Sequence, residues 1–135
     1  MAKVVFATSD AASGSAQHNV AQPDVLIGET VTYRVTATLP EGSTPQVVIS
    51  DTLPYSNGVM QVVSASVISV GSNLSPTNAS PAPTISDAQL ADGINDTVSF
   101  DFGATTNTAD GVANGNDQIV VEIVALLRNL PVNVN

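Results

Sequence analysis

Residues 29–39 alternate between apolar and polar side chains, and this pattern restricts the fold more than any other feature of the chain. Val31, Tyr33, Val35 and Ala37 are separated by threonines and one arginine. Because successive side chains of a β-strand point to opposite faces, the pattern predicts a strand with one buried face and one wet face. A helix would need a 3.6-residue repeat over a similar length, and no such repeat occurs. The chain is therefore predicted to be all-β.

Five further segments are rich in the β-branched residues that fit a pleated surface. They are residues 3–7, 46–51, 59–70, 97–102 and 118–127. The last is apolar almost throughout, so we expect it at the centre of a sheet.

Alternation within residues 59–70 places Val63, Ala65 and Val67 on one face of their strand. Tyr33 and Phe100 are expected to fill the core, because large side chains bury the most apolar area.

The chain has the size of one domain, with 135 residues, a mass of 13.7 kDa and 43% hydrophobic residues. Residues 9–24 and 71–83 are polar and rich in Gly, Pro, Asn and Ser, and are predicted as surface loops, since neither flank is large enough to fold alone. Short strands separated by turn signals predict a single immunoglobulin-like antiparallel β-sandwich over residues 1–135.

Twelve acidic residues against three basic ones give a net charge of −9. A surface this negative repels phosphate backbones and anionic lipids, so nucleic acid is not expected as a partner. No apolar run approaches the roughly 20 residues that span a bilayer, so membrane insertion is not expected either. The absence of cysteine excludes thiol chemistry, and no nucleophile–base pair accompanies the single histidine, His18. The chain is predicted not to be an enzyme.

Five motifs occur in an order that resembles a known family. They are residues 27–33 (Ile-Gly-Glu-Thr-Val-Thr-Tyr), 48–54 (Val-Ile-Ser-Asp-Thr-Leu-Pro), 100–103 (Phe-Asp-Phe-Gly), 107–111 (Asn-Thr-Ala-Asp-Gly) and 117–122 (Asp-Gln-Ile-Val-Val-Glu). Together they resemble the DUF11-like "conserved repeat" domain of large bacterial and archaeal surface proteins, and the likeness covers most of the chain.

The resemblance implies an immunoglobulin-like sandwich at the cell surface or secreted, acting as one tandem module of an adhesin stalk without enzymatic activity. Such repeats end on a further strand of the type Leu-Thr-Asn-Thr-Ala, which would follow the position of Asn133 and Asn135. Either the sequence stops short of that strand, or another chain supplies it and a filament, a homo-polymer, results. The partners would be neighbouring copies or domains. The alternative is an extracellular binding module that takes carbohydrate or a protein through residues 9–24 and 71–83.

The acidic turn of residues 110–117 has the composition of a calcium loop. Hard cations prefer oxygen ligands, and this turn offers Asp110, Asn114, Asn116 and Asp117. Residues 92–96 have a similar composition, and neither segment has the terminal glutamate of a regular twelve-residue calcium loop. The alternative is that Asn-Gly and Asp-Gly pairs simply mark hairpin turns.

Lys3 is the single lysine of the chain and lies in the first predicted strand. Some pilin and adhesin domains join such a lysine to an Asn or Asp of another strand, with a buried acid moving the protons. Asn133 is the predicted acceptor here, with Asn129 as the other choice. Three carboxylates are candidates for the acid: Glu122, and also Glu29 and Asp51. The alternative is a solvated lysine near a chain end.

Overall fold

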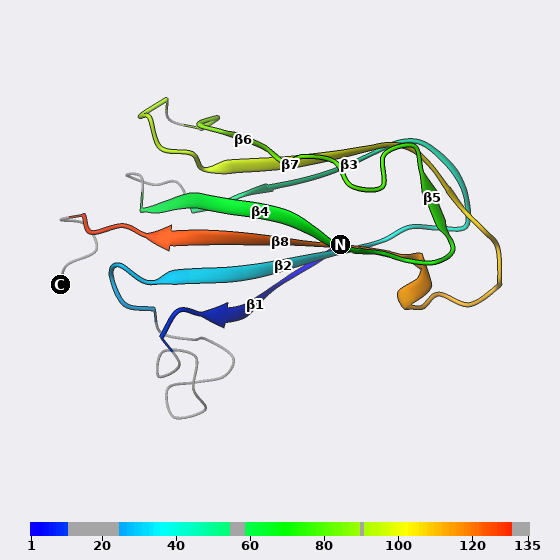
Figure 1. The fold of residues 1–135 in the computed structure, drawn as a ribbon, viewed down its shortest axis with the longest axis horizontal. Coiled ribbons are helices and arrows are strands. Elements are labelled where there is room, and N and C mark those ends of the chain that lie inside the picture. The colour runs from blue at the N-terminus through cyan, green and yellow to red at the C-terminus, as the bar shows by residue number, and fades with distance from the viewer. Residues whose placement is uncertain (11–24, 55–58, 90, 131–135) are drawn as a thin grey trace.

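The computed structural model describes residues 1–10, 25–54, 59–89 and 91–130. Over these residues the protein is all-β and consists of two packed antiparallel sheets (Figure 1). The strands are β1 (Ala2–Thr8), β2 (Thr30–Thr38), β3 (Gly42–Thr52), β4 (Met60–Val70), β5 (Leu74–Pro76), β6 (Thr84–Ser86), β7 (Thr97–Asn107) and β8 (Gln118–Leu127). No α-helix occurs in the described part of the chain, so no helix there could cross a membrane.

Sheet A has the strand order β1-β2-β8-β4, and sheet B has the order β3-β7-β5, with β6 also pairing β7. The prediction for residues 118–127 is confirmed, because β8 lies between β2 and β4. Its inward side chains Ile119, Val121, Ile123 and Ala125 are completely buried. The six predicted strands are all present, and the β-sandwich is confirmed.

The core lies between β2, β8 and β4 of sheet A and β7 and β3 of sheet B. Phe100 and Phe102 of β7 are fully buried, whereas Tyr33 is partly buried and packs against the core from β2. The fixed pleat explains this arrangement, because alternate residues of each strand face the opposite sheet.

Residues 71–83 differ from their prediction as a surface loop, because they contain β5 and continue along β7. The backbone N–H groups of Thr77 and Asn78 donate to the carbonyls of Ala104 and Phe102, at 2.8 and 3.1 Å. Together with β6, this segment forms the third strand position of sheet B. Two three-residue strands are too short to show a period of two in the sequence.

The prediction that Val63 shares a face with Ala65 and Val67 is wrong. The pairing of β4 with β8 shifts register between Val62 and Ser64, and again between Val67 and Ser69. An extra residue at such a bulge turns the following side chains to the other face. Val63 therefore points outward and is 54% exposed, while Val62 is buried.

Sheet A is one strand wider than sheet B on the side of β1. Lys3 and Val5 pair with Val35 and Tyr33 of β2, so they lie on the inner face of sheet A, yet both are exposed. Among the described residues, β3 is the edge strand of sheet B on this side, since it pairs with β7 only. Beside β1 the sandwich is therefore open, with β3 as the adjacent strand of the other sheet.

Candidate functional site

The connection from β7 to β8 contains the predicted calcium residues and closes in a single turn of 3₁₀ helix, Gly115–Asp117. Asp117 is only 2% exposed. Its Oδ2 accepts from the Asn114 backbone N–H at 2.9 Å, and the Asn114 Oδ1 accepts from the Asn116 N–H at 2.7 Å. The Asn114 side chain also accepts from the Asp117 backbone N–H, so Asn114 and Asp117 form a capping box, which satisfies the free N–H groups at the start of the turn.

Asn73 joins this turn to Asp110. Its Nδ2 donates to Asp110 Oδ2 at 2.9 Å and to Asp117 Oδ1 at 3.2 Å. Gly71 makes that approach possible, because a Cβ there would lie 2.1 Å from the carbonyl oxygen of Asn116. The Asn73 N–H also donates to this carbonyl at 3.1 Å. Asn73 thus joins the turn after β4 to the connection between β7 and β8.

Glu41, from the turn after β2, binds the other side of the same segment. Its Oε1 accepts from the backbone N–H groups of Asp110 and Gly111, at 2.8 and 2.5 Å. Asp110 Oδ1 accepts from the Val112 N–H at 2.9 Å. The three connections at this end of the sandwich are therefore linked by carboxylate and amide side chains.

The structure therefore brings together Asp110, Asn114 and Asp117 of the predicted calcium set, while the backbone of Asn116 takes part through its N–H and C=O. Internal donors already bind both carboxylates. Among the described residues, no group of three or more His, Asp or Glu side chains is arranged to hold a metal ion. Sequence reasoning missed Glu41 and Asn73, because they come from distant turns with no recognisable spacing.

Hydrogen bonding lowers the pKa of the Asp117 carboxyl. The Asn114 backbone N–H makes the largest contribution, burial opposes it, and the side chain of Asn73 adds to the lowering. The carboxylate form is thereby favoured in the folded protein.

The second predicted loop, residues 92–96, is organised by Asp96, which is buried. Its carboxylate accepts from the backbone N–H groups of Ala88 and Gln89 and from the Thr97 hydroxyl, at 3.1, 3.2 and 2.7 Å. Burial acts to raise the pKa of Asp96, but these hydrogen bonds outweigh it and the pKa is lowered. Asp96 thus fixes the chain before β7.

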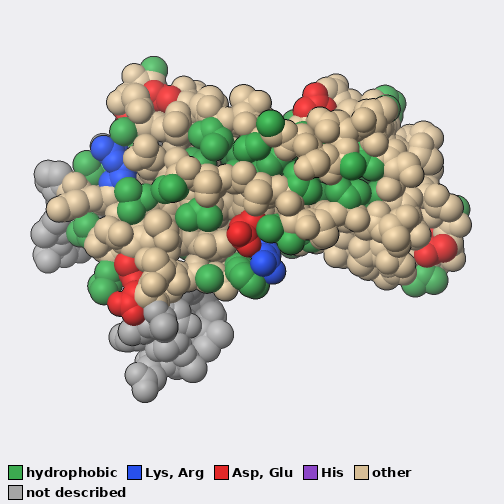
Figure 2. Space-filling view, viewed as in Figure 1, with side chains coloured by type: hydrophobic (Ala, Val, Ile, Leu, Met, Phe, Trp, Pro, Cys, Tyr) green, Lys and Arg blue, Asp and Glu red, His purple; other side chains and the backbone are tan. Residues whose placement is uncertain are grey.

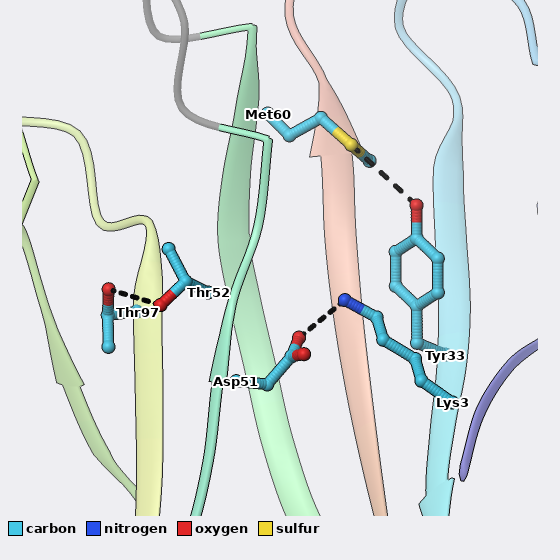
Figure 3. A network of polar contacts seen from close by, with 6 residues as sticks. All are labelled: Lys3, Tyr33, Asp51, Thr52, Met60 and Thr97. Carbon is cyan, nitrogen blue, oxygen red and sulfur yellow. Dashed lines mark hydrogen bonds and ion pairs between the residues drawn. The ribbon is translucent and has the colours of Figure 1, made fainter.

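A second polar cluster lies where the sandwich is open, between β1 and β3. Lys3 Nζ donates to Asp51 Oδ2 at 2.6 Å, and the ammonium lies 4.4 Å from the centre of the Tyr33 ring (Figure 3). The Tyr33 hydroxyl donates to the Met60 sulfur at 3.7 Å. The ion pair joins β1 of sheet A to β3 of sheet B. Burial and the nearby charge of Asp51 raise the pKa of Tyr33.

The predicted crosslink residues are separated by the fold. Glu122 lies on the outer face of sheet A, where its Oε2 accepts from Arg34 Nε at 3.1 Å, whereas Lys3 lies on the inner face. The carboxylate beside Lys3 is that of Asp51, one of the two other acids considered. Asn133 lies outside the described residues.

Phe6 occupies the outer face next to Arg34. A register shift between Val5 and Ala7 places it at a bulge, and the Arg34 guanidinium carbon lies 3.3 Å from the centre of its ring. The side of the molecule shown in Figure 2 carries scattered hydrophobic side chains and few charged ones.

Comparisons of the sequence with models of protein families and with curated proteins, and of the structure with solved structures, found no match. The fold and its polar clusters are therefore the basis for any functional proposal.

Proposed function

We propose that the protein is a non-catalytic structural module of a secreted or cell-surface protein, of immunoglobulin-like type, which bears mechanical load. It would act as a stalk repeat of an adhesin or as a filament subunit, with neighbouring copies or domains as its partners. The observation that carries this proposal is the relative direction of β1 and β8.

β1 and β8 are both antiparallel to β2, so they run in the same direction within sheet A. Ala2 pairs with Thr36, which pairs with Val120 near the start of β8, while Leu127 lies at the opposite end. The N-terminus accordingly lies at the other end of sheet A from the tip of the β8 arrow (Figure 1). The chain enters the sheet at one end and leaves it at the other, as head-to-tail modules require.

This geometry determines how a pulling force acts. Hydrogen bonds of an antiparallel ladder are perpendicular to the strands, so a pull from β1 to β8 loads the bonds along β2 together. A pull that opens a sheet from one end breaks its bonds one after another and needs less force. Forced unfolding is governed by the barrier to unfolding, which this shared loading raises.

Single-molecule stretching tests the proposal, because a cysteine-free chain accepts two unique thiol handles. Handles at Ala2→Cys and Asn129→Cys apply the shearing pull. Handles at Asp92→Cys and Asn129→Cys pull from one end of the sandwich. Both positions lie near the start of β4, because the Val62 N–H donates to the Asn95 carbonyl and the Arg128 N–H donates to the Val59 carbonyl. We expect the first geometry to require the larger unfolding force. Equal forces in both geometries would count against a load-bearing role.

Calcium belongs to the same proposal. Binding at Asp110 and Asp117 would require Asn73 to turn its Nδ2, which now donates to both carboxylates, away from them, so that its amide oxygen faces the cation. With a Kd on the order of 1 mM, as in extracellular modules, about 10 mM calcium would stabilise the fold by roughly 1.4 kcal/mol, a rise of a few degrees in Tm. Asp110→Ala should abolish this rise and Asp92→Ala should retain it. A wild-type Tm equal in calcium and in chelator would refute the site.

A further inference from the structure

β1 differs from every other long strand in how it is held. None of its seven residues is buried, and the apolar Val4 and Phe6 are 57% and 53% exposed. β8, by contrast, buries every second side chain. Because apolar burial is the main favourable term in folding, β1 gains little from the core that fixes the rest of the sandwich.

The side chains of β1 that contact β2 and β3 do so through charged groups. Lys3 binds Asp51 and lies over Tyr33, and Phe6 stacks on Arg34. Exposed ion pairs and cation–π contacts of this kind are individually weak, and salt screens the ion pairs. Opening of β1 therefore costs its ladder with β2 and these contacts, and leaves the core intact.

The edge that β1 covers belongs to β2, the most regular of the long strands that the structure describes. β2 pairs with β8 from Thr30 to Thr38 without a register shift, and it contains no proline. The other edges have features that discourage pairing. β1 has an inward-pointing lysine and a bulge, β3 has Pro45 and two register shifts, and β4 has two shifts. Among the long strands that the structure describes, only the edge of β2 would be a good template for a new strand, and β1 occupies it.

The strand that fits this edge must supply a cation opposite Asp51 and an aromatic ring for Arg34. Lys3 is the single lysine of the chain and Phe6 the one phenylalanine outside β7. With a net charge of −9, the chain has few positive groups to offer an acidic acceptor. The β1 of a second copy carries both groups at the required spacing.

We propose that β1 is an exchangeable strand: it opens while the rest of the sandwich stays folded, and the β1 of a second copy takes its place on the edge of β2, guided by Lys3 and Asp51. Exchange of an identical element is a low-cost route to assembly, because every contact of the monomer is formed again. The proposal deepens the filament form of the proposed function, which needs a strand donor, but does not depend on load bearing.

Amide hydrogen exchange of the full chain tests the opening. We expect the amide of Val4, which is paired with Arg34 of β2, to exchange faster than those of Val121 and Ile123, and the difference to grow with salt. Lys3→Gln should speed exchange in β1 about fivefold, the effect of losing one such ion pair. Asp101→Asn, an exposed charge change on β7, should leave it unchanged. If β1 and β8 exchange at one common rate, β1 opens only in global unfolding and the proposal is wrong.

A fluorescent peptide with the sequence of residues 1–10 tests the partner. The acceptor is the full chain carrying Lys3→Glu, whose own β1 is repelled by Asp51 while the acceptor edge is intact. We expect saturable binding of the wild-type peptide to this chain, and binding at least tenfold weaker when the peptide carries Lys3→Glu.

The reversed pair is the matched control. A chain carrying Asp51→Lys repels its own Lys3, so it should bind the Lys3→Glu peptide and discriminate against the wild-type peptide. Binding that follows the charge pairing in both directions supports exchange. Absence of binding, or binding indifferent to the charges, would overturn the second copy as partner. The stretching experiment stays informative in either case, because a strand that does not exchange can still carry load.

Discussion

At the scale of single residues, the pKa of Tyr33 reports the charges near β1 and β3 on the open side of the sandwich. Burial first, and the charge of Asp51 second, raise the pKa of its hydroxyl. In Asp51→Asn, the pKa of Tyr33 should move down toward the ordinary value of about 10, because one cause is removed. Ultraviolet absorbance in a Tyr55→Phe background, where Tyr33 is the remaining tyrosine, measures this shift. Glu122→Gln, on the opposite face, should leave it unchanged; an equal shift there would contradict our placement of Asp51 as the partner.

The lowered pKa of Asp117 leads us to expect that the free energy of unfolding depends on pH. Its pKa is lowered in the folded state, so its contribution to the free energy of unfolding is full above the unfolded value of about 3.9 and is lost as the pH falls through the folded pKa. Asp117→Asn should lower the urea midpoint at pH 7. The amide nitrogen that replaces one carboxylate oxygen cannot accept a hydrogen bond, so the bond from Asn114 or the bond from Asn73 is lost. The gap to the wild type should narrow as the pH falls below about 4.

Urea titrations at several pH values measure this gap. Asp92→Asn, which removes a similar charge from an exposed position, serves as its control. A gap that is constant with pH would show that the charge of Asp117 does not matter to folding.

At the scale of the elements, the three phenylalanines separate the contributions of β1 and β7. Phe102 is fully buried in β7, so Phe102→Ala should lower the free energy of unfolding by about 3–5 kcal/mol. Phe6 is half exposed in β1, so Phe6→Ala should cost about 1 kcal/mol, mainly its contact with Arg34. Urea denaturation measures both. Similar losses in the two variants would mean that β1 is part of the cooperative core.

The same elements show what the sequence could predict. β2 was predictable because its alternation indicates which face is buried, and β8 because its nearly continuous apolar run indicates a central strand. β5 and β6 were not, because three residues carry no periodicity and their pairing depends on β7. The turn of residues 110–117 was predicted to bring its acids together. Its dependence on Asn73 was not predictable, because the contact with Asp117 spans 44 positions and rests on Gly71.

At the scale of the whole molecule, the load path and the exchangeable strand combine into one prediction. A pull between Ala2 and Asn129 reaches β2 through β1, which is held by a seven-residue ladder and charged contacts. β1 should therefore detach first, by shear, in an event that lengthens the chain by on the order of 80 Å. The load then acts on Thr30 and Leu126, which are paired at one end of the β2–β8 ladder, so the rest opens from that end with a gain of roughly 300 Å. Lys3→Gln should lower the force of the first event and leave the second unchanged, because β2, β8 and β7 do not depend on the ion pair. Force–extension curves resolve the two events. A single event of the full length would show that β1 and the core yield together, which would also contradict the separate opening of β1.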